Sequence, residues 1–130
     1  MQLQRSGKCY CGAVQYETKN EWTGVINCHC KDCQQLHGIY NPMVAGSIGD
    51  ITFTKDDGLE WYQSSEKAER GFCKVCGSAM FKRVEGEDKF LISVGNLDDT
   101  SGLKTIKNVW LEGKGGYYVV PPEEPEIASK

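Results

Sequence analysis

The chain has 130 residues, of which 39% are apolar and 25% are charged, with a formal net charge of −3. This length favours one domain with a small apolar core, and the composition is typical of a soluble, turn-rich globular protein. The absence of a basic stripe argues against a nucleic-acid partner. No stretch approaches the ~20 apolar residues of a membrane span, and residues 1–6 lack the apolar core of a signal peptide. We therefore expect a cytoplasmic protein without a membrane partner.

Turn signals recur about every ten residues and divide the chain into short strands. Alternating polarity or enrichment in β-branched and aromatic types predicts strands at residues 13–17, 51–54, 59–63, 78–83, 89–94 and 106–111. In the first of these, Val14 and Tyr16 should face the side opposite Gln15 and Glu17. One short helix is expected at residues 31–36. The pattern predicts a mainly β domain over residues 1–120, followed by an extended C-terminal tail over 121–130.

The seven cysteines fall into three groups, and none stands alone. The groups are a C-x-C pair, a C-x-C-x-x-C triplet and a C-x-x-C pair, formed by Cys9 and Cys11, by Cys28, Cys30 and Cys33, and by Cys73 and Cys76. An odd count leaves one cysteine unpaired in any all-disulfide scheme, and cytoplasmic thiols stay reduced. The grouping therefore favours metal binding or catalysis over disulfides.

The first and last groups share a glycine. Gly12 follows Cys11 and Gly77 follows Cys76, and glycine accepts the positive φ that a zinc knuckle can need. Each knuckle leads into a predicted strand, so the two can meet at a sheet end. We predict that together they form a closed, tetrahedral four-thiolate zinc site, composed of Cys9, Cys11, Cys73 and Cys76. The alternative is that these are simply core cysteines.

The middle group has three thiolates and no obvious fourth ligand. Three protein ligands with one open position is the arrangement of catalytic zinc, so Cys28, Cys30 and Cys33 are the candidate catalytic residues. A second structural site remains an alternative, completed by His29, Asp32, His37 or a partner chain. A redox dithiol of Cys30 and Cys33 is another. His29 lies between two proposed ligands and should point away from the metal, whereas His37 could line the open position.

An open three-thiolate zinc site has a distinctive charge. Three thiolates and one Zn²⁺ sum to −1, so such a site should hold a substrate thiol as a nucleophilic thiolate at neutral pH. A small carbonyl compound could then be attacked by the bound sulfur, or zinc could polarise the carbonyl oxygen. The residues alone do not choose between these routes.

At these positions the chain resembles the glutathione-dependent formaldehyde-activating (GFA, or centromere-protein-V) family. The similarity rests on three cysteine-containing segments, residues 7–14, 28–33 and 70–77, and on residues 93–98, in the family's order. It implies a β-tent of several antiparallel sheets with two zinc ions per chain. It also implies that Cys9, Cys11, Cys73 and Cys76 hold the structural zinc, and that Cys28, Cys30 and Cys33 hold the catalytic one.

The activity that the resemblance implies is a carbon–sulfur lyase reaction joining glutathione to formaldehyde. The sequence departs from the family pattern in one relevant respect: Gln34 and Gln35 follow Cys33, where members often carry basic residues. Fewer positive charges would weaken the hold on glutathione's carboxylates. Two further hypotheses stay open: a non-catalytic, zinc-stapled protein-binding module, and an enzyme of the same type with another thiol or electrophile. The oligomeric state is not predicted.

Overall fold

The computed structural model describes residues 4–19 and 22–126. Its strands are β1 (Arg5–Lys8), β2 (Gln15–Thr18), β3 (Gly24–Cys28), β4 (Asn41–Ser47), β5 (Ile51–Lys55), β6 (Leu59–Gln63), β7 (Ala68–Cys73), β8 (Ala79–Val84), β9 (Lys89–Ser93) and β10 (Lys104–Val109). The α-helix is α1 (Lys31–His37), and three 3₁₀ turns are η1 (Ile48–Asp50), η2 (Val94–Asn96) and η3 (Leu111–Gly113). Among the described residues, none of these helices is long and apolar enough to cross a membrane.

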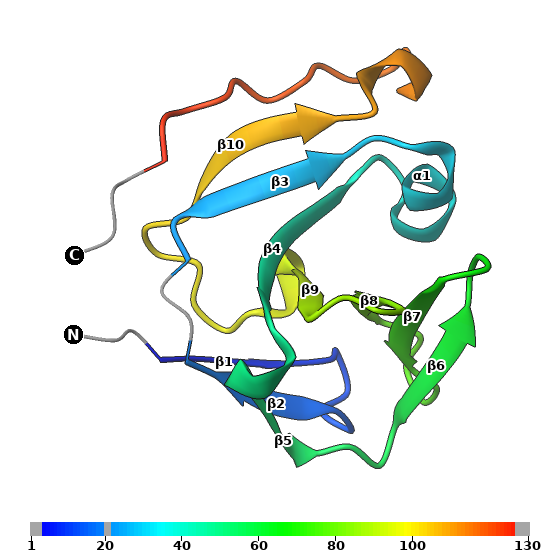
Figure 1. Cartoon of the computed structure of the whole chain (residues 1–130), viewed down its shortest axis with the longest axis vertical. Helices are drawn as coiled ribbons and strands as arrows, with labels where there is room; N and C mark the ends of the chain where they lie inside the picture. Colours follow the sequence, from blue (N-terminus) through cyan, green and yellow to red (C-terminus); the bar gives the residue numbers. More distant parts are fainter. Residues whose placement is uncertain (1–3, 20–21, 127–130) are drawn as a thin grey trace.

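The strands form two sheets (Figure 1). One has three strands in the order β1-β2-β5, and the other has seven in the order β10-β3-β4-β9-β8-β7-β6. The predicted mainly β fold with antiparallel sheets is confirmed, with one difference: β10 pairs with β3 in parallel. The larger sheet is therefore mixed, and the parallel pair places the end of β3 beside the end of β10.

Each predicted strand is present, most with shifted ends: the strand predicted at 13–17 spans Gln15–Thr18, and the one predicted at 106–111 spans Lys104–Val109. The strand predicted at 106–111 ends at Val109, because Trp110 adopts a left-handed conformation (φ 59°) that a strand cannot contain. In β2, Tyr16 and the preceding Val14 are buried while Glu17 is exposed, as alternation requires. The predicted helix is present and extends one residue further, to His37.

Two groups of buried side chains lie on opposite faces of the seven-stranded sheet. Val44 and Ile92 belong to the main core, which also includes Tyr16 from the smaller sheet. Their sequence neighbours Met43 and Leu91 instead pack against the middle cysteine group. Since successive strand residues point to opposite faces, the main core and the middle cysteine group are separated by the sheet.

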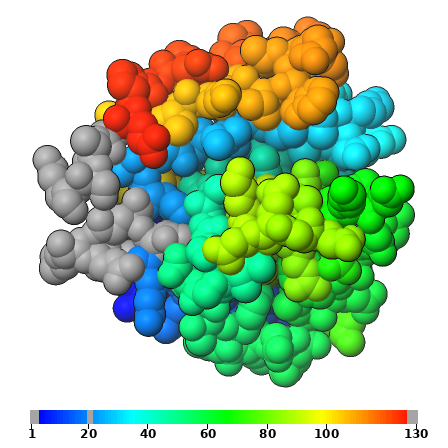
Figure 2. Space-filling model, viewed as in Figure 1, coloured from blue at the N-terminus to red at the C-terminus, as the bar shows by residue number. Residues whose placement is uncertain are grey.

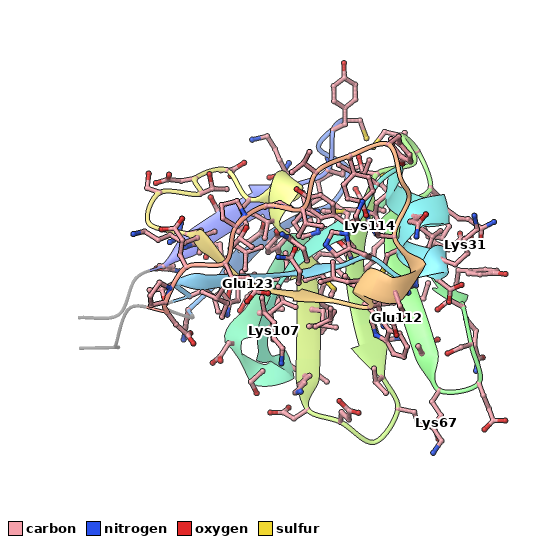
Figure 3. All side chains as sticks on the ribbon, turned by 90° about the horizontal axis from the view of Figure 1, so that it is seen from above. Lys31, Lys67, Lys107, Glu112, Lys114 and Glu123 are labelled. Atoms are coloured by element: carbon pink, nitrogen blue, oxygen red, sulfur yellow. The ribbon has the colours of Figure 1, made fainter. Side chains whose placement is uncertain are left out.

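The C-terminal segment, residues 111–126, lies along β10 and β3 (orange to red in Figure 2). The backbone N–H of Glu124 donates to Thr105 O (2.7 Å), and the Glu123 carboxylate accepts from the backbone of Asn108 (2.9 Å). Figure 3 shows Glu112 on η3 beside α1, where Gln34 Nε2 of the helix donates to Gly113 O of the same turn (2.6 Å). The division into a domain over 1–120 and a tail stays a prediction, and residues 127–130 lie outside the described part of the chain.

Candidate metal centres

The structure brings the first and last cysteine groups together. The four sulfurs of Cys9, Cys11, Cys73 and Cys76, called the quartet below, all lie within 4.8 Å of one another. Cys11 Sγ is 3.8 Å from Cys9 Sγ and 3.7 Å from Cys73 Sγ. A tetrahedral zinc site with Zn–S bonds of about 2.3 Å requires sulfurs about 3.8 Å apart. The spacing therefore fits a zinc ion, and no disulfide uses these sulfurs.

In both knuckles the chain turns at a glycine with a positive φ. Gly12 and Gly77 have φ of 84° and 83°, as the sequence predicted. The backbone N–H of Val14 donates to Cys9 Sγ (3.3 Å), so part of the sulfur charge is stabilised by the turn itself. The turn before β8 closes with Gly77 N donating to Cys73 O (2.7 Å). The shape of each knuckle is therefore defined largely by its own backbone.

Ser78 joins the two knuckles and was not singled out in the sequence. Its hydroxyl lies 3.1 Å from Cys76 Sγ and accepts from the backbone N–H of Tyr10 (3.1 Å). The Ser78 hydroxyl lowers the pKa of the Cys76 thiol to about 5. Although the backbone at Ala13 lowers the pKa of Cys11, burial and the neighbouring thiols raise it to about 11. The quartet therefore already favours a thiolate at one position without a metal.

Gly58 offers a test of how tightly the quartet is packed. A Cβ at this position would lie 2.9 Å from Cys73 Sγ and 2.9 Å from Ala13 Cβ. We expect Gly58→Ala to destabilise the protein by about 1–3 kcal/mol, as overpacking does, and to speed zinc loss to a chelator. Thermal unfolding and chelator-monitored zinc release measure both effects. Gly49→Ala is the matched control, since its Cβ would meet nothing within 4 Å; equal behaviour of the two variants would contradict the prediction.

The middle group, called the trio below, is assembled at the junction of β3 and α1. Cys28 is the last residue of β3, Cys30 is the N-cap of α1, and Cys33 lies in its first turn. Their three sulfurs lie within 4.8 Å of one another. Cys30 Sγ accepts a hydrogen bond from Cys33 N (3.4 Å), which is the contact that a capping side chain makes. The two-residue spacing between Cys30 and Cys33 therefore lets Cys30 cap the helix and brings the two sulfurs close together.

His29 points away from the trio, as the sequence predicted. The ring is fully buried, with Nε2 2.9 Å from Asn108 Oδ1 and Nδ1 2.5 Å from the Tyr118 hydroxyl. The Tyr118 ring stacks on the imidazole with centroids 5.6 Å apart. Gln34 Nε2 donates to His29 O (2.8 Å) and Gly113 O (2.6 Å). The C-terminal segment therefore holds the loop that carries Cys28 and Cys30.

Within the described residues, no histidine or carboxylate joins the trio as a fourth ligand. His29, Asp32 and His37, which the sequence left as alternatives, are absent from the group whose ligand atoms lie within 4.8 Å of each other. Both ring nitrogens of His29 are engaged elsewhere. The trio therefore has three donors where the quartet has four.

The thiols of the trio share negative charge unequally. The Cys33 thiol lowers the pKa of Cys28 to about 5, and a hydrogen bond from the backbone of Cys30 adds to the shift. The same contact with Cys28, together with burial, raises the pKa of Cys33. The set of three sulfurs favours a thiolate, which is the form that binds soft divalent metals.

Two cavities meet at the end of α1. A groove of about 650 Å³ runs from Lys8 and Tyr10 past Tyr40 to Asn96. A smaller cavity of about 290 Å³ lies between α1 and the strands β6, β7 and β8, with Arg70 in its wall. Leu36 and His37 line both. Burial lowers the pKa of His37, and the nearby Arg70 guanidinium lowers it further, so the imidazole is neutral at pH 7.

Tyr118 gives a second testable contact. We expect Tyr118→Phe to lower the free energy of unfolding by about 1 kcal/mol, because the buried His29 Nδ1 loses its donor. Denaturant unfolding measures the change. Tyr117→Phe is the matched control: the Tyr117 hydroxyl donates to Gly38 O (2.5 Å), and this side chain is exposed. An equal or larger loss in the Tyr117 variant would contradict the role assigned to the His29 contact.

Comparisons with known proteins identify one matching family, one related lyase and one similar fold. The sequence model of the glutathione-dependent formaldehyde-activating enzyme matches residues 4–113. A Schizosaccharomyces pombe protein named as an uncharacterized lyase is 25% identical over 114 residues, covering 86% of this chain and 82% of that protein. The crystal structure of a Rhodobacter sphaeroides protein is similar with a TM-score of 0.64 and 22% identity, covering 79% of this chain and 98% of the other. The last similarity concerns the fold alone.

Proposed function

Since this chain belongs to the glutathione-dependent formaldehyde-activating family, we propose that it is a zinc-dependent carbon–sulfur lyase joining a thiol to a small aldehyde. Glutathione and formaldehyde are the first substrates to test, because the family's name contains both. The S. pombe relative, named as a lyase, supports an enzyme of this class.

The observation that carries the proposal is the difference between the two cysteine clusters. The quartet offers four sulfurs and the trio offers three, and Arg70, which lies 4.0 Å from Cys33 Sγ, lines the smaller cavity. Structural zinc sites are four-coordinate and closed, whereas catalytic sites have three protein ligands. The quartet is therefore proposed to hold the structural zinc through Cys9, Cys11, Cys73 and Cys76. The trio is proposed to hold the catalytic zinc through Cys28, Cys30 and Cys33.

The residues present fit this ion. All seven cysteines are free, and thiolates are ligands that zinc prefers. Zinc at the trio would keep a substrate thiol deprotonated and could polarise a carbonyl oxygen. In the overall reaction the sulfur forms a bond to the aldehyde carbon, the C=O π bond breaks, and the thiol proton ends on the carbonyl oxygen. No oxidant or reductant is needed.

His37 is the side chain that we propose to handle the proton. It lines both cavities, and its neutral form at pH 7 can accept a proton from an incoming thiol. The protonated ring can then return that proton to the oxygen of the product. Arg70 beside it disfavours a lasting positive charge on the ring, which promotes the return step.

The proposal is tested by measuring zinc per chain and thiol-dependent consumption of formaldehyde. We expect two zinc ions and a reaction that requires the thiol. Glutathione that neither binds nor changes the rate of formaldehyde consumption, while another thiol does, would support a different thiol substrate. One zinc per chain with an intact fold would contradict the two-centre assignment.

A second candidate function is a zinc-stapled protein-binding module. It is favoured by Tyr10 and Val75, which are 93% and 67% exposed, one in each knuckle of the quartet. Exposed large apolar side chains on adjacent loops can contact another protein. A trio that holds zinc with no exchangeable ligand, in a protein inactive toward every thiol tested, would favour this function over the enzyme.

A further inference from the structure

Arg70 is a buried cation without a carboxylate partner among the described residues. It is 9% exposed, and the ion pairs found in the described part of the chain join Lys8 to Asp98, Arg83 to Glu69 and Lys104 to Glu124. Burying a guanidinium without a compensating charge is costly, so a neighbouring group is expected to offset this cost.

Arg70 contacts the trio. Arg70 Nη1 lies 4.0 Å from Cys33 Sγ, and Nε donates to Ser64 Oγ (3.2 Å), which fixes the side chain. The register places Arg70 opposite Lys82, and Lys82 opposite Leu91, which packs against the trio. Both cations therefore lie on the sheet face that carries the trio.

The remaining donor of Arg70 is available to a ligand. Nη2 donates to no described residue, and Arg70 lines the cavity of about 290 Å³. The other walls of this cavity are mostly apolar, formed among others by Leu36, Phe72 and Met80. A single guanidinium in an apolar wall is the arrangement that orients one anionic group of a small ligand.

We propose that this cavity is the subsite for a small thiol bearing a carboxylate, with Arg70 binding the carboxylate while the sulfur occupies the trio. The inference rests on the proposed function and narrows its substrate class. Three thiolates and a Zn²⁺ sum to −1, and Arg70 with Lys82 adds +2, so the surroundings favour an incoming anion. In the groove, by contrast, the Lys8 ammonium is already paired with Asp98 at 2.9 Å. Arg70 thus links the trio and the cavity through one side chain.

The test compares two thiols of equal length that differ in one end group, 3-mercaptopropionate and 3-mercaptopropanol. Their dissociation constants are measured on cobalt-substituted protein from the change in sulfur-to-metal absorption. We expect the native protein to bind the carboxylate thiol at least about tenfold more tightly. Arg70→Met should abolish this preference, because its loss weakens binding of the carboxylate thiol far more than binding of the alcohol. Arg70→Lys, which keeps the charge without the planar fork, should retain part of it.

Arg83→Met is the matched control. This arginine is on the opposite face of β8, where it pairs with Glu69 and stacks on Trp61, and its loss should leave the preference unchanged. Equal affinity of the native protein for both thiols, or a preference that survives in Arg70→Met, would overturn the carboxylate subsite but leave the proposed function standing. Failure of both thiols to bind at the trio would overturn both. Metal content and unfolding temperature of each variant establish that the chain is folded and loaded.

Discussion

Replacement of Cys73 by serine should prevent stable folding. Cys73 is fully buried, ends β7, and contributes one of the four sulfurs of the quartet. A structural zinc site can contribute on the order of 10 kcal/mol of apparent binding free energy, comparable to the total stability of a domain of this size. Loss of one ligand in a closed site removes much of that contribution. Circular dichroism, unfolding curves and zinc content of the purified variant measure the outcome.

The matched control for this prediction is Val75→Ser in the same knuckle. Val75 is exposed and supplies no sulfur, so this variant should fold and retain two zinc ions. A soluble Cys73→Ser protein with full metal content and a native unfolding temperature would contradict the role of the quartet. Prolonged treatment of the native protein with a strong chelator should reproduce the unfolding, because the metal rather than the serine is the cause.

Cys30→Ser should leave a folded protein with one tightly bound zinc and almost no activity. Cys30 caps α1, and serine is itself a favoured N-cap residue, so the helix should be preserved. The trio then has two sulfurs and a hydroxyl, which is a much weaker zinc ligand than a thiolate. We expect turnover to fall by at least about a hundredfold, since loss of outer-shell partners alone costs 10–100-fold.

The decisive measurement is the pairing of metal content with stability. One zinc per chain, an unfolding temperature within a few degrees of native and lost turnover would support separate roles for the two clusters. Unfolding of Cys30→Ser comparable to that of Cys73→Ser would mean that both clusters stabilise the fold. Full activity in Cys30→Ser would remove the trio from the chemistry.

The short strands that alternate clearly, such as β2, β5 and β6, could be predicted from the sequence because one face is buried and the other is not. Strands β4 and β7 were missed for a physical reason: Pro42 and Gly46 interrupt β4, and Gly71 interrupts β7. These residues usually weaken strands, and here pairing on both sides compensates. Two further strands were also missed: β1 is short and polar, and β3 ends in the trio.

The grouping of the cysteines was accessible from spacing and from Gly12 and Gly77, because metal ligands and turns have local signatures. The partners of these groups were not. Tyr118 and Asn108 lie 89 and 79 positions from His29, and Arg70 reaches Cys33 of α1 from strand β7. Such contacts depend on the parallel pairing of β10 with β3 and on the register of β7, neither of which has a signal in the local pattern.

Strand β7 connects the two clusters directly. It carries Arg70 toward Cys33, and three residues later it ends in Cys73 of the quartet. The order of metal loading during maturation of a newly made chain should follow from this. Until the quartet has captured its ion, the guanidinium has no fixed position opposite the trio. We expect stepwise titration of the apo-chain to fill the knuckles first, so that catalytic competence arises last.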